Sequence, residues 1–173
     1  MARALVVYES VFGDAETIAR AIAAGIGTRL PADVVAAREA PTELADVALL
    51  VVGGPTHAFG MPSPKTREGA VAQYGAHLDD TAHGLHEWLD SALLPRGLSA
   101  AAFDTRMDHP KLITKLDHAA KTEEKLLKGL GATLVAPAEH FLVTDASGPL
   151  ADGEEERARR WGQTLGELVS ARR

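Results

Sequence analysis

The chain has 173 residues, of which 46% are hydrophobic, and these values suit a single domain over residues 1–173 with a substantial core. It contains no cysteine, which excludes disulfides, thiolate metal sites, iron–sulfur clusters and cysteine nucleophiles. The formal net charge is −6, and there is no basic stripe among aromatic residues, which argues against nucleic acid and anionic membranes as partners. No apolar run is longer than residues 47–52, which is too short to span a bilayer, so we expect a soluble cytoplasmic protein.

A buried strand, a short loop and an amphipathic helix are predicted at the start of the chain. The strand covers Arg3–Tyr8, the loop covers Glu9–Asp14, and Ile18, Ile22 and Ile26 then recur every four residues. The first N–H groups of such a helix lack intrahelical acceptors, and the helix dipole places partial positive charge there. This end of the helix is therefore a predicted anion site.

Strand and helix patterns alternate through the rest of the chain. Further strands are expected at Asp33–Ala37, Val47–Gly53, Ser99–Phe103 and Thr133–Val143, the last interrupted at Pro137. Helices are expected at Thr42–Ala45, Thr81–Leu93 and Lys111–Leu130, and a last helix from about Asp152, which is predicted to cap it. Because parallel strands need crossover connections, this alternation predicts an α/β fold, a doubly wound five-stranded parallel sheet in three layers.

Residues 62–80 do not fit the alternation. The segment is rich in glycine, proline and charge, and it lies between the third strand and the helix expected after it. Long segments of this kind frequently form lids or binding loops. We therefore expect a surface insertion that is mobile or contributes to an interface.

The first loop resembles a known phosphate-binding motif. The sequence YESVFGDAETIA is similar to the phosphate loop of flavodoxins, in which a strand is followed by [ST]-x-[ST]-G-x-[ST] and a helix. Ser10 and Gly13 match the pattern, whereas Phe12 and Ala15 replace hydroxyl residues and Asp14 lies between Gly13 and Ala15. The resemblance implies a flavodoxin-like sheet with strand order 2-1-3-4-5 and FMN as the cofactor.

Ligands of open parallel sheets bind at the carboxyl ends of the strands, where three of the loops meet. The resemblance implies an FMN site with the phosphate at Ser10, Val11, Phe12, Gly13, Asp14 and Ala15, the flavin ring against Pro55, Thr56, His57, Ala58, Phe59 and Gly60, and its polar edge at Asp104, Thr105 and Arg106. A cation such as Arg106 near the ring would stabilise the anionic reduced form. The resemblance requires no catalytic residue and no metal.

Each of these features also has a purely structural interpretation. Gly13 is compatible with a simple tight turn, and Ser10 with capping of the backbone. His57, Phe59 and Met61 are compatible with loop packing against the sheet edge. Arg106 is compatible with an ion pair to a neighbouring aspartate.

Three functions are compatible with the resemblance to flavodoxins. The first is an FMN-binding electron-transfer protein, monomer or homodimer, that works with redox partner proteins, a reductase and an acceptor, or with a small electron acceptor. The second is an NAD(P)H:quinone-type reductase in which residues 62–80 and His57 shape a substrate pocket. The third is a binding domain that keeps the fold but has lost FMN, for which Phe12, Asp14 and Ala15 are the evidence. Neither a P-loop nor a dinucleotide-binding glycine motif is present in the sequence.

Overall fold

The computed structural model describes residues 2–57, 60–78, 80–108 and 119–173. Its centre is a parallel sheet in the order β2-β1-β3-β4-β5, which confirms the predicted order, and a sixth strand, β6, also pairs with β4. The strands are β1 (Arg3–Tyr8), β2 (Ala32–Ala36), β3 (Val47–Pro55), β4 (Ser99–Met107), β5 (Thr133–Leu134) and β6 (Glu139–Val143). The helices are α1 (Asp14–Ile26), α2 (Pro64–Tyr74), α3 (Leu85–Ser91), α5 (Ala119–Gly129) and α6 (Glu154–Ser170), with a short 3-10 turn, η1 (Ala37–Glu39).

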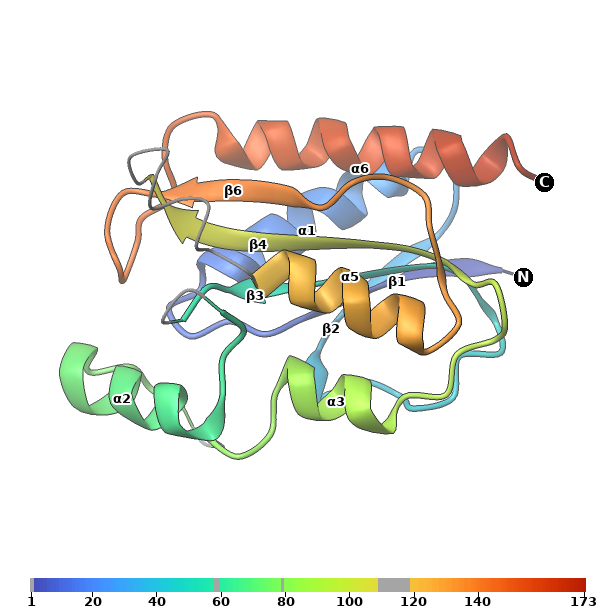
Figure 1. Ribbon diagram of the computed structural model, residues 1–173. Helices are drawn as coiled ribbons and strands as arrows, with labels where there is room; N and C mark the ends of the chain where they lie inside the picture. The colour runs from blue at the N-terminus through green and yellow to red at the C-terminus, as the bar shows by residue number, and fades with distance from the viewer. Residues whose placement is uncertain (1, 58–59, 79, 109–118) are drawn as a thin grey trace.

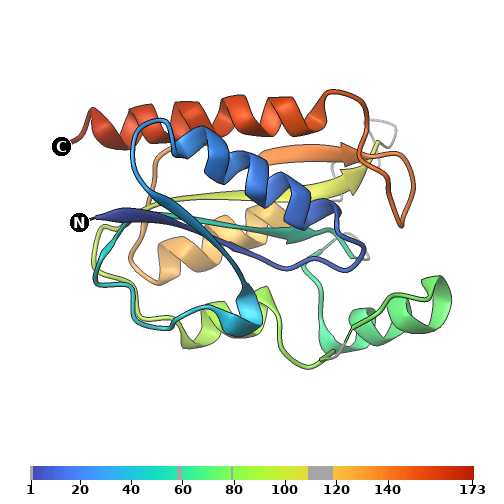
Figure 2. The same cartoon turned by 180° about the vertical axis from the view of Figure 1, so that it is seen from behind.

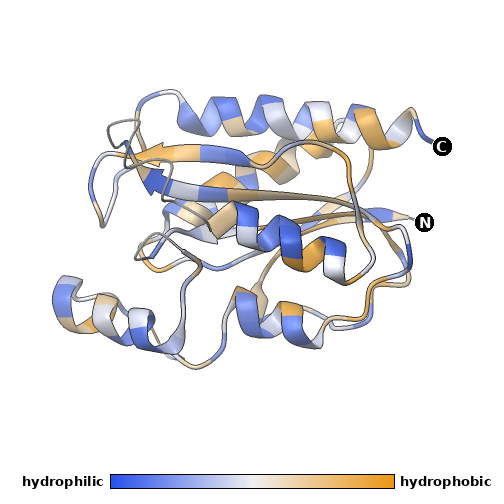
Figure 3. Ribbon diagram, in the orientation of Figure 1, coloured by the Kyte–Doolittle hydropathy of each residue, from blue (hydrophilic) through white to orange (hydrophobic). Residues whose placement is uncertain are grey.

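The helices form one layer on each face of the sheet, as Figures 1 and 2 show. Helices α1 and α6 cover one face, and their core includes Ile18, Ile22 and Ile26, which are fully buried as their spacing predicts. Helices α3 and α5 cover the other face, where Leu89 and Leu127 are buried. The predicted three-layer architecture is therefore confirmed, and the N-terminal half of α6 presents hydrophilic residues on its outer side (Figure 3).

Helices α1 and α6 approach each other closely because glycine lies on both. A Cβ atom built on Gly25 would lie 2.0 Å from the carbonyl oxygen of Arg159, and one built on Gly162 would lie 2.1 Å from that of Ile22. Each glycine therefore allows the backbone of one helix to pack directly against the other. The close contact fixes α1, and with it the helix end at the sheet edge.

The segment 62–80 contains a helix that the sequence analysis did not predict. Ser63 and Thr66 form a reciprocal capping box at the start of α2, and Pro64 occupies its first turn. Gly75, with φ 66°, ends the helix in the left-handed conformation. Although α2 extends away from the main body (Figure 1), these caps give it defined ends.

Two of the expected helices differ from those observed. The predicted helix at residues 42–45 is wrong, because Glu43 forms an isolated parallel bridge with Leu93, whose N–H donates to the carbonyl of Thr42 at 2.7 Å, and a turn follows at Ala45. The helix expected at residues 81–93 is shorter, because the Asp80 carboxylate accepts the N–H groups of Ala82 and His83 and holds this segment in a turn. For residues 111–130 the structure describes only α5, and residues 111–118 lie outside the described ranges.

Other boundaries also differ. Asp152 does not cap the last helix, because α6 begins after Gly153, which has φ 82°, and no side chain caps it. Strand β2 begins one residue earlier than expected. Residues 104–107, expected in a loop, belong to β4 because β6 pairs alongside them, from Phe103 with Glu139 to Met107 with Val143.

The carboxyl ends of the strands point to one end of the molecule, and both chain termini lie at the other (Figure 1). None of the helices in the described ranges has the length and hydropathy needed to traverse a membrane.

Candidate functional site

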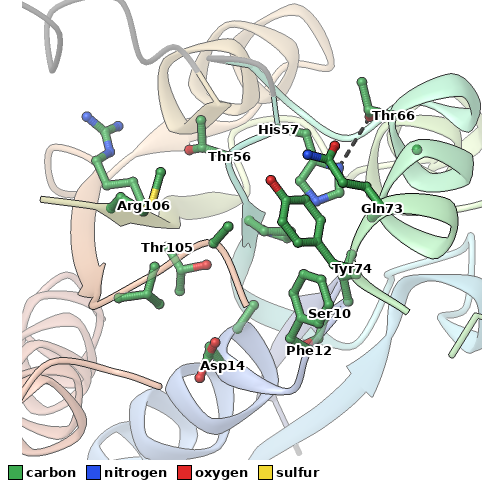
Figure 4. Close-up of a pocket in the computed structure, with 18 residues that line it drawn as sticks. Ser10, Phe12, Asp14, Thr56, His57, Thr66, Gln73, Tyr74, Thr105 and Arg106 are labelled. Carbon is green, nitrogen blue, oxygen red and sulfur yellow. Dashed lines mark hydrogen bonds between the residues drawn. The ribbon is translucent and has the colours of Figure 1, made fainter. Parts of the chain in front are cut away.

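A cavity with a volume of about 460 Å³ opens at the carboxyl edge of the sheet (Figure 4). It lies between the start of α1, the ends of β3, β4 and β6, and one side of α2. Its lining residues are Ser10, Val11, Phe12, Asp14, Ala15, Pro55, Thr56, His57, Thr66, Gly69, Ala70, Gln73, Tyr74, Thr105, Arg106, Met107, Val143 and Ala146. Cavities of 300–1,000 Å³ are typical of sites for small organic ligands and cofactors.

The start of α1 presents backbone donors beside this cavity. Gly13 precedes the helix with φ 99°, and its own N–H donates to Ser10 Oγ at 3.0 Å. Within the described ranges, the N–H groups of Asp14, Ala15 and Glu16 have no hydrogen-bond acceptor. The helix end therefore combines free donors with the positive end of the helix dipole, as the sequence predicts for this segment.

Aromatic and imidazole side chains form one wall. The rings of Phe12 and Tyr74 meet edge to face, with centroids 6.1 Å apart. Tyr74 extends from α2 toward His57 (Figure 4), and His57 Nδ1 lies 3.2 Å from Thr66 Oγ1. Burial lowers the pKa of His57, so its imidazole is neutral at neutral pH.

Two threonines define the floor of the cavity at the ends of β3 and β4. The N–H of Thr56 donates to the carbonyl of Thr105 at 2.9 Å, which holds the two strand ends together. Thr56 Oγ1 is buried, and it has no hydrogen-bond partner among the residues that the structure describes. A buried hydroxyl without a partner is costly, so this atom is a natural contact for a polar ligand group.

Arg106 and Asp104 belong to a buried ionic cluster rather than to an exposed loop. Arg106 Nε donates to Asp104 Oδ1 at 3.0 Å, and His140 Nδ1 lies 3.0 Å from the same oxygen. Asp104 is fully buried and Arg106 nearly so. Burial alone would raise the pKa of Asp104, but the hydrogen bonds with His140 and Arg106 outweigh it and lower that pKa. The structure therefore shows the ion pair between Arg106 and a neighbouring aspartate that the purely structural interpretation of Arg106 predicts.

A second buried ion pair attaches α2 to the sheet. Arg67 is 1% exposed, and its Nε and Nη2 donate to the two carboxylate oxygens of Glu9 at 2.8 and 2.9 Å. Arg67 Nη1 also lies 2.6 Å from Glu87 Oε1 on α3. Gly84 makes room for this pair, because a Cβ there would lie 2.1 Å from Glu9 Oε1. Glu9 directly precedes Ser10, so the pair joins α2 to the loop before α1.

A third acidic side chain lies near these pairs. Glu123 on α5 is fully buried, and both of its carboxylate oxygens lack a hydrogen-bond partner within the described ranges. Burial, followed by repulsion from Asp104 and Glu9, raises the pKa of Glu123 well above its ordinary value. The buried Glu123 carboxyl group therefore holds its proton more tightly than an exposed glutamate does.

The structure brings most of the predicted site residues together. Those that line the cavity are Ser10, Val11, Phe12, Asp14, Ala15, Pro55, Thr56, His57, Thr105 and Arg106. Gly13 shapes the turn before α1, and Gly60 and His57 pair through reciprocal backbone hydrogen bonds. Asp104 lies behind the cavity in the ionic cluster, and the predicted Ala58 and Phe59 fall outside the described residues.

The sequence analysis named no individual residue of α2, although its reductase alternative gave residues 62–80 a part in shaping a pocket. Cavity-lining residues that were not predicted are Thr66, Gly69, Ala70, Gln73, Tyr74, Met107, Val143 and Ala146. The sequence did contain a signal for the helix: Ser63, Pro64 and Thr66 have the spacing of a capped helix start. Nothing in the sequence indicated which side of that helix faces the strand ends.

No protein-family model matches the chain, and no curated protein matches it. Solved structures do. An archaeal flavodoxin has a TM-score of 0.64 and 18% identity, over 97% of this chain and 99% of that one. A flavodoxin, WrbA-like protein from Agrobacterium tumefaciens has a TM-score of 0.60 and 17% sequence identity, over the full length of both chains. A flavodoxin from Streptococcus pneumoniae has a TM-score of 0.60 and 15% sequence identity, and the match covers 99% of this chain and 100% of that one. The chain therefore has a flavodoxin-like fold.

Proposed function

We propose that the protein binds FMN in the cavity at the carboxyl edge and serves as an electron-transfer protein. The observation that carries this proposal is the arrangement at one cavity: unpaired N–H groups of α1 lie at one side, and flat side chains on α2 and the loop after β3 lie at another. The first suits a phosphate and the second suits an aromatic ring system. The likeness to flavodoxins supports the same cofactor.

The residues present fit FMN in size and in most of their chemistry. The cavity volume of about 460 Å³ lies within the range for cofactor sites. The unpaired Thr56 Oγ1 offers a hydrogen bond to a polar ligand edge, and Ser10 adds a hydroxyl beside the free N–H groups. Asp14 is the exception, because its carboxylate would repel a phosphate.

The chain itself would bind, orient and shield the cofactor, and FMN, when bound, supplies the ability to accept and donate electrons. The N–H groups at the start of α1 would hold the phosphate. Phe12, Tyr74 and His57 would limit the access of water to the ring. Arg106 is already paired with Asp104, so its charge would act on the ring from a fixed position.

A second function, reduction of a small electron acceptor, is favoured by the position of α2. Thr66, Gln73 and Tyr74 place polar atoms on the wall of the same cavity, and the Arg67–Glu9 pair holds that wall in position. Turnover of NAD(P)H with a small acceptor would favour the reductase, whereas reduction only by a partner protein would favour the carrier.

Fluorescence quenching tests FMN binding directly. Titration of the protein into micromolar FMN should quench the flavin fluorescence saturably at one site per chain, and AMP should not compete. The variant Gly13→Glu should abolish quenching, because φ 99° is strained for any L side chain and glutamate adds a negative charge at the helix end. Gly129→Ala, at a position with no atom within 4 Å of the added Cβ, is the control and should bind as the wild type does. Unquenched FMN at saturating wild-type protein would refute the proposal.

A further inference from the structure

Asp14 is one of two acidic residues in the first turn of α1, and the other, Glu16, is paired with Arg20. Asp14 is the first residue of the helix and lines the cavity, on the side opposite His57 (Figure 4). Its carboxylate packs against the loop after β6, since a Cβ built on Gly148 would lie 2.4 Å from Asp14 Oδ2. Among the described residues, Asp14 forms no hydrogen bond through its side chain and no ion pair. Its charge is thus not neutralised by a neighbour.

Such a carboxylate acts on the same helix end as a phosphate. Negative charge in the first turn of a helix is favourable because it interacts with the positive end of the dipole. In the ligand-free protein, Asp14 supplies part of that charge. When a phosphate arrives at the same helix end, however, two anions share it, and their mutual repulsion reduces the gain from binding.

The charged groups on the elements around Asp14 do not cancel this repulsion. Glu16, also in the first turn, is paired with Arg20 at 2.8 Å. Asp145, in the loop after β6, is exposed, and its Oδ1 accepts the N–H of Ala146 at 2.7 Å. Across the cavity, Arg106 is held by Asp104, and His57 is neutral because burial lowers its pKa.

We propose that Asp14 is a specificity-determining residue of this site, a resident anion that weakens the binding of flavins with a doubly charged phosphate relative to flavins without one. This inference rests on the proposed FMN-binding function. It implies that FMN is held as an exchangeable ligand and that riboflavin, which has no phosphate, competes with it better than the helix end alone would allow. It also implies that FMN binds more tightly as pH falls.

The direction of the pH effect follows from the two acids that face each other. A phosphate monoester loses its second proton at about pH 6. Burial raises the pKa of Asp14 above its ordinary 3.8, so its carboxylate takes up a proton earlier than an exposed aspartate does. As pH falls, each protonation removes one negative charge from the repelling pair. FMN affinity therefore rises toward low pH, while riboflavin affinity changes little.

The test compares two flavins on three proteins. Kd values for FMN and riboflavin are measured by fluorescence quenching at pH 8.0 and at pH 5.5 for the wild type, Asp14→Asn and Asp145→Asn. Asp145→Asn removes the same charge from a neighbouring exposed position, so it controls for net charge. We expect Asp14→Asn to bind FMN about tenfold more tightly than the wild type at pH 8.0, equivalent to about 1.4 kcal/mol. We expect this ratio to shrink at pH 5.5, riboflavin Kd values to stay within twofold, and Asp145→Asn to behave as the wild type does.

Three results would overturn the inference, and they can be told apart. If wild type and Asp14→Asn bind FMN equally, Asp14 has no such role, although the proposed function stands. If Asp14→Asn gains affinity for both flavins alike, its effect is on the pocket and not on the phosphate. If none of the three proteins binds either flavin, the proposed function falls as well. Asp14→Ser serves as a second variant and should reproduce the gain, which separates loss of the charge from any effect of the asparagine side chain.

Discussion

At the start of α1, one hydroxyl group organises the turn that presents the backbone donors. Ser10 Oγ accepts the N–H of Gly13 at 3.0 Å, and Thr17 Oγ1 donates to the carbonyl of Gly13 at 3.1 Å. Gly13 is thereby held from both sides in a left-handed conformation that few other residues adopt without strain. The hydroxyl proton of Ser10 remains available to a ligand. The sequence predicts Ser10 and Gly13 correctly as the residues of this turn, because their effects are local.

Ser10→Ala should weaken FMN binding by about 1–3 kcal/mol, which is roughly 5- to 150-fold in Kd. The substitution removes one donor to the phosphate and the acceptor that orders Gly13. Fluorescence titration measures the change, and Ser147→Ala, at an exposed position in the loop after β6, is the matched control. Equal Kd values for wild type and Ser10→Ala would place the phosphate elsewhere.

Glu123 is a buried acid whose proton stabilises the fold. Because its pKa in the folded protein is raised above the ordinary 4.5, the folded state binds the proton more tightly than the unfolded state does. The free energy of unfolding therefore decreases as pH rises from about 4.5 toward the raised pKa. Glutamine has nearly the same shape as the protonated glutamate and does not titrate, so the stability of Glu123→Gln does not decrease with pH for this reason.

Glu123→Gln should equal the wild type in stability below pH 4.5, and above it the difference in favour of Glu123→Gln should grow by about 1.4 kcal/mol per pH unit until the raised pKa is reached. Urea unfolding at several pH values measures the difference. Asp104, whose lowered pKa has the opposite effect on stability, is present in both proteins, so its contribution cancels in the comparison. Parallel stability profiles for the two proteins would show that Glu123 is ionised in the fold.

At the scale of elements, α2 gives the cavity a wall that the sheet alone does not provide. Its capping box and C-terminal glycine define the helix locally, but its attachment depends on Arg67, which reaches Glu9 directly after β1 and Glu87 on α3. These partners are distant in sequence. Local patterns therefore predict β1, α1 and the core of β3, whereas the position of α2 and the strand character of residues 104–107 depend on pairings between remote segments.

Arg67→Met should lower the free energy of unfolding by about 3–5 kcal/mol, because it leaves the Glu9 carboxylate buried without its partner. It should also weaken FMN binding, since the wall that contains Tyr74 loses its attachment to β1. Urea unfolding and FMN titration measure the two effects. Arg160→Met, at an exposed position of α6, removes the same charge and should change neither. An Arg67→Met protein with wild-type stability would mean that α2 is held by other contacts.

At the scale of the whole molecule, the sequence pattern determines the fold more clearly than it determines the function. Apolar strands that alternate with amphipathic helices allow few topologies, and the crossover rules for parallel sheets leave the observed order among them. The site is different. Its helix end was predictable from one loop, while its second wall and its ionic clusters depend on how separate elements meet.

FMN should stabilise the entire fold if it binds only the folded state. At a concentration of FMN one hundred times its Kd, the free energy of unfolding should increase by about 2.7 kcal/mol. For a domain of this size, that increase corresponds to a rise in Tm of roughly 5–11 °C. Differential scanning calorimetry measures the shift, with AMP at the same concentration as the control. No shift at a concentration that saturates quenching would mean that FMN binds the unfolded chain as well.

The central claim is that the backbone N–H groups at the start of α1 hold the phosphate of FMN. A crystal of the protein soaked in FMN tests it most directly. We predict electron density for the phosphate within about 2.7–3.2 Å of the N–H nitrogens of Asp14, Ala15 and Glu16, with the ring in the cavity beside Tyr74. Density for FMN at another place, or only solvent at this helix end in a fully soaked crystal, would contradict the account.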